Sequence, residues 1–65
     1  MSEPTTPQLG WLLKLRNLGR VSERYAGYRA ATIKACEKRG WCVFKDQSWR
    51  LTEAGQQAIV ALAYS

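Results

Sequence analysis

The chain has 65 residues, a formal net charge of +5 and a hydrophobic content of 46%. A chain of this length can form one small domain with a single core, and its hydrophobic content is above that of disordered chains. It has no apolar run near the roughly 18 residues needed to span a membrane, and no signal-peptide pattern at its start. We therefore expect a cytoplasmic domain over residues 6–65, preceded by a loose tail over residues 1–5.

Residues that could carry catalysis or hold a metal are few. The chain has no histidine, and its two cysteines, Cys36 and Cys42, cannot supply the four ligands of a structural zinc site. The five carboxylates are scattered, with no pair placed for acid–base work. We expect no enzyme activity, no cofactor and no metal. Cys36 is predicted to be a buried free thiol that behaves as a small apolar residue.

The positive charge is concentrated in the middle of the chain. Residues 14–39 hold eight basic residues against Glu23 and Glu37, an excess of six, whereas residues 1–13 and 40–65 contribute minus one and zero. Such a local excess suits a polyanionic partner, either nucleic acid or an acidic protein. On charge alone, a solvated basic face explains it equally well.

The first predicted helix spans residues 7–18. Thr6 is the expected N-cap, with Pro7 at the first helical position, and Gly19 is placed where a left-handed C-terminal cap ends a helix. The apolar residues of this segment are too many for one narrow stripe, so the helix should bury two surfaces. They are Leu9, Trp11, Leu12, Leu13, Leu15 and Leu18.

A second helical region is predicted up to Arg39. Residues 20–22 form the expected connection, with Ser22 as the next cap, and Gly27 favours a break into a one-turn helix over residues 22–26 and a longer helix from Tyr28. A single helix through Gly27 is the alternative. The apolar face consists of Ala26, Ala30, Ile33 and Cys36. The opposite side is aromatic, small and basic, with Arg24, Tyr28, Ala31, Ala35 and Lys38, flanked by Thr32 and Lys34.

A hairpin and a final helix complete the predicted fold. Gly40 ends the basic helix, residues 41–44 and 49–51 have strand character, and the polar residues between them form the loop. Thr52 is the expected N-cap of the last helix, which has no polar residue from Ala58 to Tyr64 and should bury more than one face. The large aromatic residues are predicted to build the core rather than to stack on bases. They are Trp11, Tyr25, Trp41, Phe44 and Trp49.

The order helix, glycine, hairpin and capped helix over residues 28–55 resembles the winged-helix superfamily of bacterial and archaeal regulators, including the multiple-antibiotic-resistance-regulator type, and in part a ribosomal protein of archaea and eukaryotes. The resemblance implies a mainly α fold with a small β-hairpin (α+β), in which a short helix precedes the recognition helix. Two stretches carry it: Ala31-Thr32-Ile33 with Glu37-Lys38-Arg39-Gly40-Trp41, and Trp49-Arg50-Leu51-Thr52-Glu53-Ala54-Gly55, which contains the LT-x-x-G junction.

The family resemblance implies a dimeric transcriptional regulator that binds double-stranded DNA through the outward face of this helix and through the hairpin, or wing. The implied contacts are Arg24, Tyr28, Arg29, Thr32, Lys34, Lys38, Lys45 and Arg50. Arg29 is the best candidate for a base contact, because its guanidinium can pair with two acceptors on guanine, and the lysines suit phosphates.

Two departures from the family pattern concern the DNA contacts. The chain between Val21 and Gly40 is shorter than a full helix-turn-helix, and the hairpin loop is short with one acidic residue, Asp46. Both features also suit a module that binds an acidic protein partner instead of DNA, which is the alternative function. The apolar first and last helices predict a homodimer through residues 7–18 and 53–64.

Overall fold

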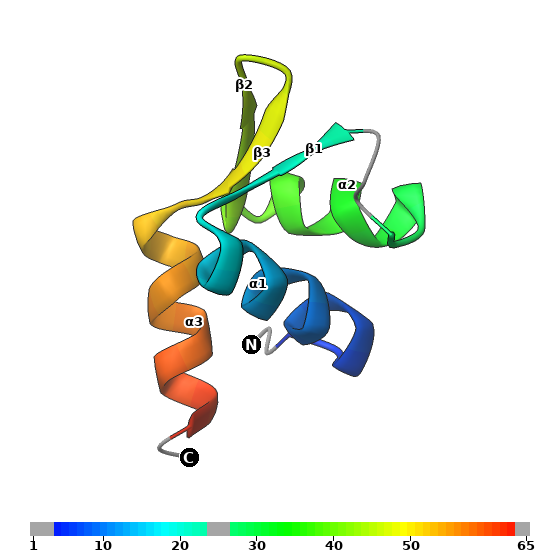
Figure 1. Cartoon of the computed structure of the whole chain (residues 1–65). Coiled ribbons are helices and arrows are strands. Elements are labelled where there is room, and N and C mark those ends of the chain that lie inside the picture. The colour runs from blue at the N-terminus through cyan, green and yellow to red at the C-terminus, as the bar shows by residue number, and fades with distance from the viewer. Residues whose placement is uncertain (1–3, 24–26, 64–65) are drawn as a thin grey trace.

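The computed structural model describes residues 4–23 and 27–63 and shows a small α+β domain, as predicted, while the winged-helix arrangement stays a prediction. Within the described residues, three helices accompany a three-stranded antiparallel sheet with strand order β1-β3-β2 (Figure 1). Along the chain, the elements are α1 (Thr6–Leu18), β1 (Arg20–Ser22), α2 (Ala30–Lys38), β2 (Cys42–Lys45), β3 (Ser48–Leu51) and α3 (Glu53–Ala63).

The connection predicted over residues 20–22 is wrong, because this segment is strand β1. Val21 pairs with Trp49 of β3 and is buried, while its neighbours are more exposed, so the segment alternates as a half-buried strand does. In a segment of only three residues, the sequence pattern of such a strand cannot be distinguished from that of a loop. Ser22 lies in strand β1, and the one-turn helix predicted over residues 22–26, with Ser22 as its cap, lies largely outside the described residues.

Helix α1 begins one residue earlier than predicted. Thr5, not Thr6, is the N-cap: its hydroxyl accepts a hydrogen bond from the Gln8 backbone N–H at 3.4 Å, and the Gln8 side chain accepts from the Thr5 N–H at 3.0 Å. This reciprocal capping box selects Thr5 over Thr6 because only Thr5 has a glutamine three residues later. Gly19 ends the helix at a φ of +80°, as predicted.

Helix α2 is shorter at its start than predicted. Arg29 is its N-cap with extended backbone, so Tyr28 precedes the helix. At the other end Gly40 has a φ of +79°, and the Trp41 N–H donates to the Cys36 carbonyl at 3.0 Å. This hydrogen bond spans five residues instead of the four of an α-helical bond, as in the Schellman motif, which needs a residue such as glycine at positive φ. It confirms the prediction that Gly40 ends the helix.

The hairpin is tighter than the four-residue loop predicted from the sequence. β2 and β3 are joined by Asp46 and Gln47, which have φ values of 53° and 61°, as in a type I′ turn. Each strand therefore reaches one residue further toward the turn than its hydrophobic pattern indicates. The register places Phe44 opposite Trp49, with Trp49 also opposite Val21 of β1.

The start of α3 is clamped to the turn that follows α2. The Thr52 hydroxyl accepts from the Gly55 N–H at 3.1 Å, which confirms the predicted cap, and it donates to the Gly40 carbonyl oxygen. The Thr52 N–H donates to the carbonyl oxygen of Trp41 at 3.1 Å. One threonine thus fixes the end of α2, the start of β2 and the start of α3 relative to one another.

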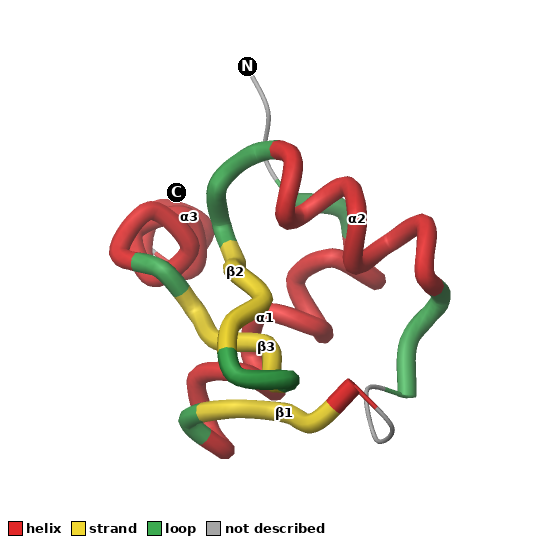
Figure 2. The backbone as a smooth tube through the Cα atoms, turned by 90° about the horizontal axis from the view of Figure 1, so that it is seen from above, coloured by secondary structure: helices red, strands yellow, loops and turns green. Residues whose placement is uncertain are grey.

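The core lies where α1 meets the sheet and the other two helices. Figure 2, the view from above, shows α1 beneath the strands, with α2 and α3 on opposite sides of the hairpin. The buried apolar residues are Trp11, Leu12, Leu15, Val21, Ile33, Cys36, Trp41, Cys42, Trp49 and Ile59. Three predicted core aromatics are therefore confirmed. Phe44 is a wrong prediction, since it is 40% exposed near the hairpin turn, and Tyr25 lies outside the described residues.

Candidate nucleic-acid interface

Helix α2 turns a basic surface to solvent. Ile33 and Cys36 are buried as predicted, and Lys34 and Lys38 are exposed, although Ala30, predicted on the apolar face, is exposed as well. We define the α2 face as the solvent-facing side of this helix. It consists of the exposed residues Arg29, Ala31, Lys34, Lys38 and Arg39, together with the half-buried Ala35. With Glu37 included, residues 29–39 carry three of the five net positive charges of the protein.

Tyr28 does not belong to the α2 face, contrary to the prediction. Its ring centroid lies 5.7 Å from that of Trp11, and the Lys14 Nζ lies 5.8 Å from its centroid. The hydroxyl end sits against Gly10, whose missing side chain leaves space for it. The start of α2 at Ala30 places Tyr28 in the preceding segment, so its ring follows the surface of α1 rather than the outside of α2.

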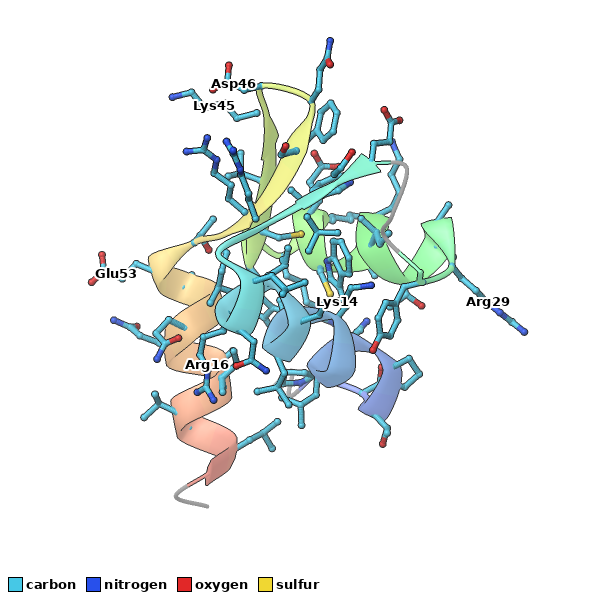
Figure 3. The ribbon with its side chains drawn as sticks, viewed as in Figure 1. Lys14, Arg16, Arg29, Lys45, Asp46 and Glu53 are labelled. Carbon is cyan, nitrogen blue, oxygen red and sulfur yellow. The ribbon has the colours of Figure 1, made fainter. Side chains whose placement is uncertain are left out.

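The other predicted contacts lie on a different surface. Arg29 and Lys45 extend toward opposite sides of the molecule in Figure 3, because Arg29 caps α2 and Lys45 stands beside the hairpin turn. Arg50 forms an ion pair with Asp46 at 3.8 Å, so it belongs with Lys45 on the hairpin. Thr32 is half-buried, and Arg24 lies outside the described residues. The structure therefore divides the predicted contacts between two surfaces.

Two basic residues of these surfaces were missed in the sequence. Arg39 is exposed at the end of α2, with its guanidinium carbon 5.4 Å from the Trp41 ring centroid, a cation–π distance. Arg20 lies in β1 directly opposite Arg50 of β3. Arg39 could have been predicted, because it directly precedes the helix-ending Gly40 and lies two residues from an aromatic side chain, Trp41. Arg20 could be found only by recognising residues 20–22 as a strand.

A groove lies between α2 and the inner face of the hairpin. One half, of about 240 Å³, is lined by Glu23, Tyr28, Ala30, Ile33, Lys34 and Trp49. The other half, of about 250 Å³, shares Glu23, Lys34 and Trp49 and adds Glu37 and Phe44. The Phe44 and Trp49 rings are 5.0 Å apart at their centroids and form an aromatic wall. Because it holds two carboxylates and one ammonium group, the groove is less basic than the α2 face.

The two cysteines are free and buried, side by side in the core. Burial, together with the neighbouring Cys42, raises the pKa of the Cys36 thiol from its ordinary value of 9.0 to about 11, while Arg39 opposes the shift. Burial likewise raises the pKa of Cys42, whose Sγ lies 3.9 Å from the Ile33 carbonyl oxygen. Both thiols are therefore protonated at neutral pH and poorly nucleophilic.

A stability measurement in alkali tests the raised thiol pKa. Between pH 9 and about 11, Cys36 ionises in the unfolded chain but not in the folded one, so the free energy of unfolding should fall as pH rises through this window. The shift corresponds to a loss of about 2–3 kcal/mol. Urea unfolding of the wild type and Cys36→Ala measures it: the variant should show a shallower decline, and identical declines would contradict the assignment.

Neither a metal centre nor a membrane span is evident in the part of the chain that the structure describes. No group of three or more His, Cys, Asp or Glu side chains gathers to hold an ion among these residues. No helix within residues 4–23 and 27–63 is long and apolar enough to cross a membrane.

Fold and surface together define a small α+β domain that presents a short basic helix beside a hairpin. Comparison of the chain with protein-family models, with curated proteins and with solved structures finds no match.

Proposed function

We propose that the domain is a reduced winged helix that binds double-stranded DNA as a compact regulator of bacterial or phage type. The order α1-β1-α2-β2-β3-α3 and the sheet order β1-β3-β2 support the arrangement. The observation that carries the proposal is the α2 face, where four exposed cations lie on one rigidly held helix and at its two caps, with the small residues Ala31 and Ala35 between them. Cations of this kind neutralise phosphates and release counterions, which drives binding to DNA.

The positions on the α2 face suit different contacts. Arg29 precedes the helix, where residues of a recognition helix reach base edges, and its fork can pair with two acceptors on guanine. Lys34 and Lys38 lie one turn apart on the exposed side and suit phosphates. Ala31 and Ala35 lie between these cations and allow the helix backbone to approach the groove closely. The clamp at Thr52 fixes the direction in which α2 points.

Binding to a duplex of about 20 base pairs tests this proposal. Fluorescence anisotropy should show an affinity that falls steeply with salt, and Lys34→Ala and Lys38→Ala should each lower the slope of log K against log salt by about one unit. Failure to detect binding at about 50 mM salt would overturn the proposal.

Dimer formation belongs to the same proposal. Leu18 and Val60 are 62% and 39% exposed, and a second pocket of about 270 Å³ lies between α1 and α3, lined by Leu9, Leu13, Arg16, Ile59 and Leu62. A second copy covering this apolar surface would give two α2 faces on one particle. Sedimentation should show a dimer at tens of micromolar, and a monomer at that concentration would remove the dimer from the proposal.

The groove between α2 and the hairpin favours a second candidate function, the binding of a protein partner. Its aromatic wall and two carboxylates suit an apolar side chain followed by a basic one, unlike the acidic partner expected from charge alone. Phe44→Ala and Glu37→Gln distinguish the candidates: both should leave duplex binding within about twofold if the α2 face binds DNA. A loss of capture of a basic partner by the same variants would support the protein candidate.

A further inference from the structure

The outer face of the sheet carries an array of hydrogen-bond donors. Side chains alternate along strands, so Val21, Phe44 and Trp49 point inward and their neighbours outward. One outward row runs Arg20, Arg50, Val43 across β1, β3 and β2, and the next runs Ser22, Ser48, Lys45. The three strands contain no acidic residue. We define these six residues as the outer sheet face.

The pairing of two arginines on this face costs stability. Arg20 lies directly opposite Arg50, and like charges at opposed positions of an antiparallel pair repel. Only Arg50 is partly neutralised, by Asp46 at 3.8 Å, and within the described residues no carboxylate forms an ion pair with Arg20. The Arg50 Nε is buried without a hydrogen-bond partner in that same part of the chain. An anion bound between the two guanidinium groups would relieve the repulsion.

We propose that the outer sheet face binds the phosphodiester backbone of a nucleic acid. Guanidinium pairs suit phosphate because their planar forks donate two hydrogen bonds each, and the serine hydroxyls and Lys45 add further donors in the second row. The rows are about 7 Å apart along the strands, so two phosphates can be held at once. Because strands form this face and α2 lies on the other side of the sheet, the contact is independent of sequence.

This surface is separate from the α2 face. Lys45 extends to the side opposite Arg29 in Figure 3, so one straight duplex lying on α2 does not reach the outer sheet face. The domain therefore holds two nucleic-acid segments, one on each side. The choice of nucleic acid as the ligand rests on the proposed function. The surface itself and the repulsion between Arg20 and Arg50 are independent of that function. Two carboxylates border it: Asp46 at the turn and Glu53, which extends to the same side.

The test uses two duplexes of about 16 base pairs, one labelled with a donor and one with an acceptor fluorophore. The wild-type protein should bring them together and give energy transfer. Arg20→Thr and Lys45→Gln, both at exposed positions, should each reduce the transfer at least about fivefold while changing binding to a single duplex less than about twofold. Asp46→Asn removes the competing carboxylate and should increase the transfer.

A thermal measurement without DNA provides a second readout. Arg20→Thr should raise Tm by about 2–4 °C at low salt, because it removes the repulsion from Arg50 and introduces a residue that favours strands. Unchanged transfer in Arg20→Thr would overturn the inference whatever the Tm of this variant, because the bridging would then come from a homodimer through α1 and α3. If instead Lys34→Ala retains all binding and Arg20→Thr abolishes it, the outer sheet face is supported and the proposed role of α2 fails.

Discussion

Gly55→Ala should unfold most of the protein. A Cβ at this position would overlap the carbonyl oxygen of Trp41 and come within 2.6 Å of the Leu51 Cδ1. The carbonyl cannot move away, because it already accepts the Thr52 N–H and belongs to the turn that ends α2. We expect a loss of about 3 kcal/mol or more, even though alanine favours a helix over glycine. A domain of this size has only a few kcal/mol of net stability, so thermal unfolding followed by circular dichroism measures the effect.

Gly10→Ala is the matched control, a glycine-to-alanine change in the other well-packed helix. Its Cβ would lie 2.8 Å from the Tyr28 hydroxyl, which is the far end of a side chain that can shift. The gain in helix propensity, about 1 kcal/mol, should offset that adjustment and leave Tm within a few degrees of the wild type. Equal stability of Gly55→Ala and Gly10→Ala would contradict the close packing at the LT-x-x-G junction.

Trp11→Ala should abolish cooperative folding. The ring is fully buried, with the Trp49 ring 6.3 Å away at 79° and the Tyr28 ring 5.7 Å away between centroids. Truncation of such a residue costs about 3–5 kcal/mol, which is as much as the whole net stability of so short a chain. Urea unfolding should show no sigmoidal transition for this variant.

Phe44→Ala separates core aromatics from surface ones. Phe44 contacts Trp49 but is 40% exposed, so its truncation should cost about 1 kcal/mol and preserve the cooperative transition. If Phe44→Ala and Trp11→Ala were equally destabilising, the hairpin would contribute to the core as much as α1 does.

The parts of the fold that follow from local chemistry were predictable. Gly40 ends α2 because it can adopt a positive φ, and Thr52 caps α3 because its side chain reaches the third N–H. Both effects are decided by residues within five positions. The helix stop at Gly40 and the helix cap at Thr52 indicate the same order of elements, so the fold of residues 28–55 could be predicted from the sequence.

The features that the sequence could not supply depend on contacts between distant segments. Strand β1 forms because Val21 can pair with Trp49, about half the chain away. Tyr28 lies against α1 because Gly10 leaves room for its hydroxyl, which no periodicity indicates. The candidate contacts were predicted on one DNA-binding surface, because the family resemblance places the recognition helix and the wing on the same duplex. Lys45 and Arg50 lie on the hairpin, apart from the α2 face, because the sheet separates them in space.

Mapping of backbone amide shifts during titration with a duplex of about 20 base pairs, or about two helical turns, tests the role of α2 most directly. If the α2 face is the interface, the largest shifts will fall on Ala31, Lys34, Ala35 and Lys38, and they will shrink as salt is raised. Shifts at saturating duplex that leave these four amides unchanged and appear instead at Phe44 and Trp49 would contradict a DNA-binding α2.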